Sequence, residues 1–167
     1  MSLNITPHPD TEIDPLAVIE EIISDAGWHY ERDDDDAIQC AVPGRWGEMG
    51  GLFALRMEPA AIHFSVTLDV KPVAAKRAAI AELVMMANER LWLGHFDYWA
   101  EDGVLLFRHA LPMLDRDEPS EGEIRSVIAA ATDSIDRFVP AFNFVIWAGK
   151  TPHDAIDAAM FETAGEA

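Results

Sequence analysis

The single thiol of the chain is the first group to consider for chemistry, because a thiolate can act as a nucleophile or as a metal ligand. The 167 residues include one cysteine, Cys40. A catalytic cysteine needs a nearby histidine and partial exposure. Cys40 instead shares its parity with Ile38 and Val42 and alternates with Gln39. The pattern predicts a buried cysteine with a structural role.

The histidines do not form a metal-binding motif. None is spaced as His-x-x-x-His or His-Glu-x-x-His, and none is paired with the cysteine at ligand spacing. His63 and His109 could meet on one sheet face if their strands are neighbours, but two exposed strand histidines is the interpretation we prefer. The six are His8, His29, His63, His95, His109 and His153.

The remaining polar and glycine-rich segments also lack the spacing that chemistry requires. Asp33 to Asp36 has neither the alternating ligands nor the mid-loop glycine of a calcium loop, so it is typical of a solvated turn. The glycines from Gly44 to Gly51 do not form a phosphate-binding motif. No Gly-x-Ser-x-Gly elbow is present. We therefore expect no catalytic residue, no cofactor and no metal ion, and a protein that is not an enzyme.

Composition restricts the class of partner. The chain has 30 acidic against 12 basic residues, a formal charge of −18, and half of its residues are hydrophobic. Such a surface repels phosphate backbones and anionic lipid, so we expect neither nucleic acid nor membrane as a partner. The lone cysteine fits a reducing compartment, and no export signal or membrane-spanning stretch is visible. These features predict a cytoplasmic protein.

The elements that must position any site begin with a helix. Apolar residues from Leu16 to Ala26 recur at helical spacing and stop at Gly27. A hairpin with the aspartates at its tip follows, and then a strand from Gly51 to Glu58. Ile62 to Val70 alternates strictly between apolar and polar, which indicates a half-buried antiparallel strand.

The second half begins with another predicted helix, from Val73 to Trp92, which Gly94 ends. A hairpin follows, with a tight turn at 101–103 and a strand at 104–111. A third helical stripe runs from Ile124 to Phe142, with a kink or a break into two helices expected at Pro140. Thr151 and Pro152 open a last short helix.

These elements predict one α+β domain. The expected order is α-β-β-β-α-β-β-α-α, with an antiparallel sheet of about five strands and helices packed on it. Hairpin-linked strands disfavour a doubly wound parallel sheet. We expect a flexible N-terminal tail at 1–13 and a single domain at 14–163.

One strand suggests a binding surface. Val104, Leu105, Leu106 and Phe107 are apolar in succession, so this strand should be covered on both faces. In its own strand, Trp99 lies on the opposite face from Phe96 and Tyr98, which are expected to face the core. We interpret Trp99, Leu105 and Phe107 as candidate partner-binding residues. The apolar surface that they form must be covered either by the C-terminal helices or by another chain.

Two segments resemble the YbjN family of proposed bacterial sensory-transduction regulators. The first is 87–97, Ala-Asn-Glu-Arg-Leu-Trp-Leu-Gly-His-Phe-Asp, with the strand at 104–108. The second is 138–142, Phe-Val-Pro-Ala-Phe, with 145–152 and 155–156. The resemblance covers roughly residues 14 to 160. It implies a type III secretion chaperone-like fold, often dimeric, with no established catalytic residue, and regulation or chaperone-like partner binding. The acidic loop at 112–122 has no counterpart in the family pattern.

Three functions follow as hypotheses. The leading one is a non-enzymatic regulatory or chaperone-like domain that binds another protein of unknown identity and forms a homodimer. The alternative is a small-molecule sensor or enzyme with a pocket between sheet and helices, lined by Trp46, Trp92 or Trp99. The third is a structural domain with no separable activity.

Overall fold

The computed structural model describes residues 13–33, 36–71 and 73–164. Its α+β architecture confirms the predicted fold class. The predicted tail, apart from Ile13, lies outside the described residues. In chain order the elements are α1 (Ala17–Asp25), β1 (Tyr30–Asp33), β2 (Ala37–Gly44), β3 (Gly47–Met57), β4 (Ala60–Thr67), the short 3-10 helix η1 (Ala74–Lys76), α2 (Arg77–Asn88), β5 (His95–Trp99), β6 (Val104–Pro112), α3 (Glu121–Ile146) and α4 (Pro152–Ala164).

The strands form one antiparallel sheet in the order β1-β2-β3-β4-β6-β5. This part of the chain has six strands where about five were expected, with four rather than three before α2. The short strand β1, of four residues, is the first arm of the hairpin expected from the sequence, so the expected total of three strands before α2 counted that hairpin one strand short. Strand β1 pairs with β2 from Tyr30 opposite Cys40 to Asp33 opposite Ala37, so Asp33 and Asp36 lie at the end of the hairpin, as expected, while the two aspartates between them lie outside the described residues.

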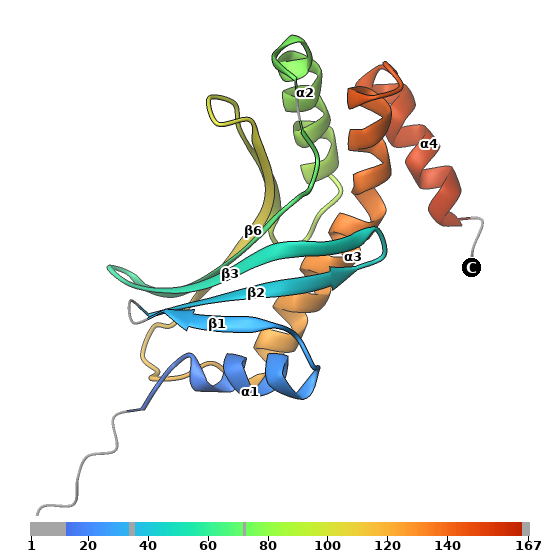
Figure 1. Ribbon diagram of the computed structural model, residues 1–167. Helices are drawn as coiled ribbons and strands as arrows, with labels where there is room; N and C mark the ends of the chain where they lie inside the picture. The colour runs from blue at the N-terminus through green and yellow to red at the C-terminus, as the bar shows by residue number, and fades with distance from the viewer. Residues whose placement is uncertain (1–12, 34–35, 72, 165–167) are drawn as a thin grey trace, which may run out of the picture.

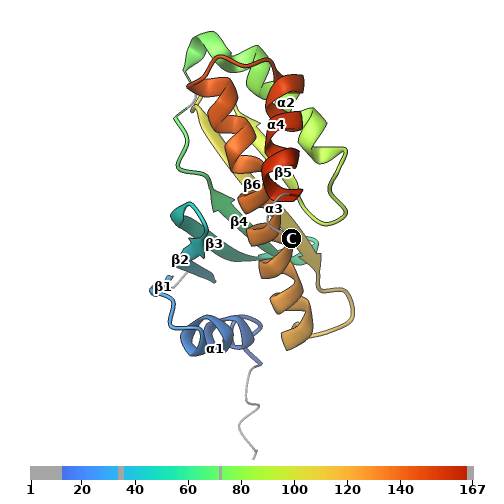
Figure 2. The ribbon, with the colours of Figure 1, turned by 90° about the vertical axis from the view of Figure 1, so that its right-hand side faces the viewer.

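The described helices lie on one side of the sheet (Figures 1 and 2). Between them and the sheet is a continuous hydrophobic core. Four phenylalanines form its centre: the Phe96 ring lies 5.5 Å from Phe107, 5.7 Å from Phe138 and 5.4 Å from Phe142, all edge to face. This geometry is the favoured one for aromatic pairs. The sheet is therefore joined to α3 through aromatic contacts at β5 and β6.

The edge strand β5 has a side chain paired with its backbone. The predicted helix to Trp92 ends earlier, at Asn88. Asn88 Nδ2 donates to the carbonyl oxygen of Phe96 at 3.0 Å, and the Phe96 N–H donates to Asn88 Oδ1 at 2.8 Å. The amide side chain thus makes the two hydrogen bonds that a further strand would make at Phe96.

Helix α3 continues through Pro140, so the expected break into two helices does not occur. Proline lacks an N–H and leaves the carbonyl oxygen four residues earlier without its helical donor. That oxygen belongs to Asp136, and Trp46 Nε1 donates to it at 3.0 Å. The Arg45 N–H donates to Asp136 Oδ1 at 2.9 Å. The β2–β3 turn therefore supplies the hydrogen bond that the proline removes.

Candidate protein-binding surfaces

The face of the sheet opposite the described helices is composed mostly of small or neutral side chains. Directly opposed residues share a face, so the strand registers define rows across it. One row runs through Glu31, Gln39, Leu52, Ser65, Arg108 and His95; a second through Ala41, Gly50, Thr67, Leu106 and Asp97; a third through Asp33, Ala37, Ala54, His63 and Ala110. We call these three rows the open face. Its middle has few charges, although the chain carries −18 overall.

Trp99 lies at one end of the open face and is held by polar contacts. Its side chain is 46% exposed, and Trp99 Nε1 donates to Asp97 Oδ2 at 3.1 Å. Arg108 forms an ion pair with Asp97 at 3.4 Å and donates through Nε to His95 Nε2 at 3.3 Å. These contacts fix an aromatic ring beside a paired arginine, an arrangement common in protein interfaces.

Leu105 and Phe107, by contrast, do not share a surface with Trp99. Both are 0% exposed in the core under the chain's own helices, so of the two alternatives left open for them, burial by the chain's own helices or by another chain, the structure shows the first. Strand parity is the reason: Leu105 pairs with Tyr98 and Phe107 with Phe96, on the helix side of the sheet. The apolar residues of this strand on the side of Trp99 are Val104, which pairs with Trp99, and Leu106, which pairs with Asp97 and is 3% exposed.

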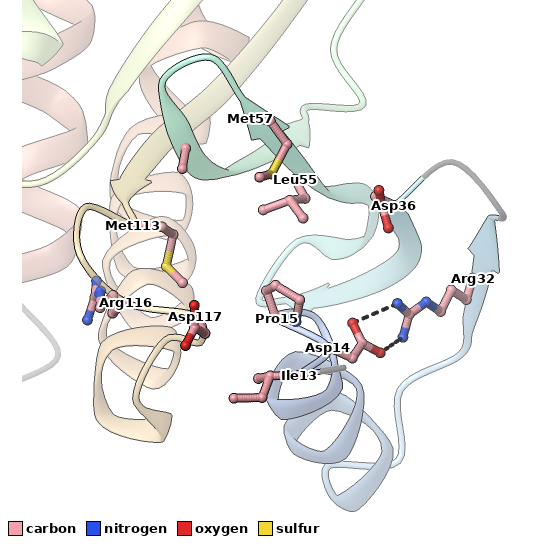
Figure 3. Close-up of a pocket in the computed structure, with 11 residues that line it drawn as sticks. Ile13, Asp14, Pro15, Arg32, Asp36, Leu55, Met57, Met113, Arg116 and Asp117 are labelled. Carbon is pink, nitrogen blue, oxygen red and sulfur yellow. Dashed lines mark hydrogen bonds and ion pairs between the residues drawn. The ribbon is translucent and has the colours of Figure 1, made fainter. Parts of the chain in front are cut away.

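A second feature is a groove between the segment that leads into α1, the β3–β4 hairpin and the loop after β6 (Figure 3). Its volume is about 810 Å³. In Figure 3 the Leu55 and Met57 side chains point down into it, with Met113 on one side and Pro15 below. Its lining residues are Ile13, Asp14, Pro15, Arg32, Asp36, Leu55, Met57, Ala60, Met113, Arg116 and Asp117. We call it the α1 groove.

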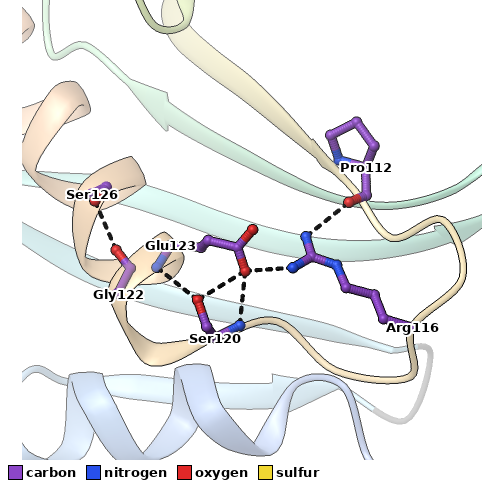
Figure 4. Close-up of polar contacts among 6 residues, drawn as sticks. All are labelled: Pro112, Arg116, Ser120, Gly122, Glu123 and Ser126. Atoms are coloured by element: carbon purple, nitrogen blue, oxygen red, sulfur yellow. Dashed lines mark hydrogen bonds and ion pairs between the residues drawn. The ribbon is translucent and has the colours of Figure 1, made fainter.

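The two arginines of the α1 groove are already paired. Arg32 contacts Asp14 at 2.6 and 2.9 Å and Glu20 at 2.9 Å. These bonds raise the pKa of Arg32, and the Arg32 hydrogen bond lowers the pKa of Asp14. Arg116 bonds Glu123 at 2.5 Å and the Pro112 carbonyl oxygen at 3.0 Å, so it points away from the groove (Figures 3 and 4).

Glu123 also closes the N-terminus of α3. The Ser120 hydroxyl accepts from the Glu123 N–H at 3.2 Å, and Glu123 Oε2 accepts from the Ser120 N–H at 2.9 Å, which is a capping box (Figure 4). The hydrogen bond from Arg116, followed by those from Ser120, lowers the pKa of Glu123 to about 2 from its usual 4.5. One carboxylate therefore fixes both the loop after β6 and the start of α3.

The Glu123→Gln variant is expected to be less stable than the wild type by about 1 kcal/mol at neutral pH, a modest loss because the side chain is one-third exposed and screened by solvent. Because the folded pKa is depressed, the carboxylate stabilises the fold above pH 4.5, and this contribution is lost as pH falls from 4.5 toward 2. Urea denaturation at several pH values should show the two proteins converging in acid. Glu121→Gln, which changes a more exposed carboxylate, is the control. A difference in unfolding free energy between Glu123→Gln and the wild type that does not depend on pH would contradict the lowered pKa of Glu123.

The structure also places the residues considered for chemistry. Cys40 is 7% exposed, which confirms its predicted burial, and this burial raises the pKa of its thiol to about 11. His63 is exposed on the open face, whereas His109 pairs with Phe64 on the helix side and is half-buried. Burial, and then the nearby His95, lower the pKa of His109. The two candidate histidines therefore lie on opposite faces. Among the described residues, no group of three metal-ligating side chains is close enough to hold an ion.

None of the three tryptophans expected to line a pocket borders the α1 groove. Trp46 is bonded to Asp136, and Trp99 is on the open face. Trp92 is 99% exposed beside a smaller cavity of about 230 Å³ that Ala130 and Arg137 also line. The groove could not be predicted from sequence, because Ile13, Met57 and Met113 are far apart in the chain and come together only in the fold. The signal available in the sequence was Met57, an apolar residue at a hairpin end.

Comparison with known proteins gives a family and a fold. A family model described as "putative bacterial sensory transduction regulator", YbjN, matches residues 15–144. The chain belongs to the YbjN family. Among solved structures it is similar to YbjN from E. coli, described as "a putative transcription regulator", with 15% sequence identity and a TM-score of 0.51. That match covers 77% of this chain and 94% of the E. coli chain. No curated protein matches the sequence.

The resemblance stated from sequence is thereby confirmed, and the matched range includes every lining residue of the α1 groove except Ile13 and Asp14. It also includes every row of the open face. Within the described part of this YbjN-family chain, no helix has the length and apolar character needed to cross a bilayer.

Proposed function

We propose that this YbjN-family chain is a non-enzymatic regulatory domain of the cytoplasm that binds a partner protein through the open face and acts as a homodimer. The observation that supports the proposal is a six-stranded sheet whose second face carries no described helix. Six strands at a spacing of about 4.8 Å make a face roughly 25 Å across, which is the scale of a standard interface.

The chemistry of the open face supports a protein partner. Small side chains allow another layer to approach closely, and Leu52, at 37% exposed, lies in the middle row with Ser65 beside it. At the end of the face, Trp99 and Arg108 are of the types most enriched in interface hot spots. The near absence of charge in the middle reduces the desolvation cost of a contact.

The variant that tests the face is Leu52→Glu, which places a charge at its centre. Partners captured from the native lysate by the wild type should be recovered at least tenfold less by Leu52→Glu, because a buried unpaired charge opposes association. Ala129→Glu, an equal change of charge on an exposed position of α3, is the matched control. Light scattering of the purified protein should give twice the 18.5 kDa of one chain.

Two results would overturn the proposal: equal recovery of every partner by both variants, or a protein that stays monomeric at all concentrations. Circular dichroism melts of both variants must match the wild type, which ensures that the comparison reports binding.

Small-molecule sensing is the second candidate, and the α1 groove is the observation that favours it. Its volume of about 810 Å³ falls within the range of about 300–1,000 Å³ that ligand pockets occupy. A metabolite present at about 100 times its dissociation constant would add roughly 2.7 kcal/mol of stability, which a thermal-shift screen detects. A hit on a monomeric protein would favour this candidate over partner binding.

A further inference from the structure

The α1 groove has an apolar strip that is left uncovered by the part of the chain that the structure describes, residues 13–33, 36–71 and 73–164. Met57 is 68% exposed and Ile13 is 52% exposed at its rim, while Leu55 is half-buried and Met113 is buried. Methionine side chains are flexible and polarizable, so surfaces that contain them adapt to the side chains of a bound segment. Exposed apolar side chains from two separate segments, Ile13 and Met57, gathered around one hollow, are typical of an interaction site.

The charges around this strip are not balanced. Arg32 and Arg116 are already bonded to carboxylates. Asp36 and Asp117 also line the groove, and within the described residues neither carboxylate has an ion-pair or hydrogen-bond partner. Figure 3 shows the two on opposite sides of the apolar strip. The hollow is therefore apolar in the middle and negative at both ends.

We propose that the α1 groove binds a short apolar peptide segment of another protein that carries lysine or arginine on both flanks. The apolar side chains of the segment fill the hollow against Leu55, Met57 and Met113, and its basic flanks reach Asp36 and Asp117. This site is separate from the open face.

The arrangement fits a peptide better than a small molecule. A small-ligand pocket presents a few polar groups that converge on one bound molecule. Here Arg116 points away from the hollow, Arg32 is occupied, and the two unpaired carboxylates are separated by the strip (Figure 3). A ligand that contacts both carboxylates and the apolar surface between them must be extended, with a cationic group near each of its two ends.

The probe is a short fluorescein-labelled peptide of four leucines flanked by two lysines at each end, titrated by fluorescence anisotropy. We expect the double variant Asp36→Asn with Asp117→Asn to weaken its binding at least fivefold. Asparagine is chosen because Asp36 has a φ of 56°, which asparagine tolerates. Met57→Ser should weaken the same peptide severalfold through lost apolar contact.

A basic peptide could also be attracted to any acidic protein surface, and a second double variant serves as the control for this effect. Glu101→Gln with Asp102→Asn, in the exposed turn between β5 and β6, changes the net charge by the same amount and should change affinity less than twofold. If both double variants lose the same amount of peptide affinity, the binding is due to general electrostatic attraction and the proposal is overturned. Equal binding of a peptide whose lysines are replaced by glutamates would also overturn it.

Two further measurements decide the class of occupant. Benzyltrimethylammonium, a small aromatic cation, should give no thermal shift; stabilisation by this ion without binding of the peptide would assign the groove to small molecules and overturn the proposal. Leu52→Glu, on the open face, should leave peptide binding unchanged. The proposal for the open face and the proposal for the α1 groove can therefore fail independently of each other.

Discussion

Replacing Phe107 with alanine is expected to lower the free energy of unfolding by about 3–5 kcal/mol, the usual cost of deleting a buried aromatic ring. Phe107 is 0% exposed, and its ring meets Phe96 edge to face at 5.5 Å. Removing it leaves a cavity where the sheet meets α3. Since domains of this size are stable by about 5–15 kcal/mol, the loss is a large fraction of the total. Urea denaturation of the purified protein measures it.

Trp99→Ala is the matched control, because Trp99 is the candidate binding residue that stays 46% exposed. Its loss of stability should remain under about 1 kcal/mol, as for other exposed substitutions. The reverse pattern, with a stable Phe107→Ala variant that binds its partner poorly, would show that Phe107 acts at an interface after all.

The Gly94→Ala variant should lose about 2–5 kcal/mol of stability for two separate reasons. Gly94 has a φ of 69°, where a side chain costs about 1–2 kcal/mol. A methyl group there would also overlap the Phe107 ring and lie 3.1 Å from the Arg108 carbonyl oxygen. Crowding of this kind in a packed core costs about 1–3 kcal/mol.

Gly27→Ala separates these two contributions. Gly27 has a similar φ of 73°, but a methyl group there would meet nothing within 4 Å, so only the backbone cost of about 1–2 kcal/mol applies. The difference between the two variants in thermal or urea denaturation measures the crowding. If Gly94→Ala is no less stable than Gly27→Ala, then β5 does not pack against Phe107 as described.

The parts of the fold that could be predicted from sequence are those that depend on local periodicity. The alternation from Ile62 to Val70 and the helical stripe from Ile124 to Phe142 identified β4 and α3, because each pattern reports burial of one face. The end of α2 could not be predicted in this way. Asn88 ends the helix by bonding Phe96, and that contact exists only after β5 is in place.

Pro140 shows the same limit. Proline in a helical pattern indicates a kink or a break, yet Trp46, ninety residues away from Asp136, compensates for the missing hydrogen bond. The candidate surfaces depend even more on the fold. The parity of Trp99 was visible in the sequence, but the side on which Leu105 and Phe107 lie depends on strand register. The α1 groove needs three segments to meet, and no local pattern encodes that meeting.

The side chain of Asn88 has a consequence for how copies of this protein can assemble. An unprotected outer strand can recruit the strand of a neighbour, and repeated recruitment leads to ribbons of unlimited length. With the Phe96 amide and carbonyl both occupied, growth sideways at β5 is blocked at that position. A strand from a second copy therefore cannot form the full ladder of hydrogen bonds along β5, which disfavours the open-ended stacking of copies at this edge.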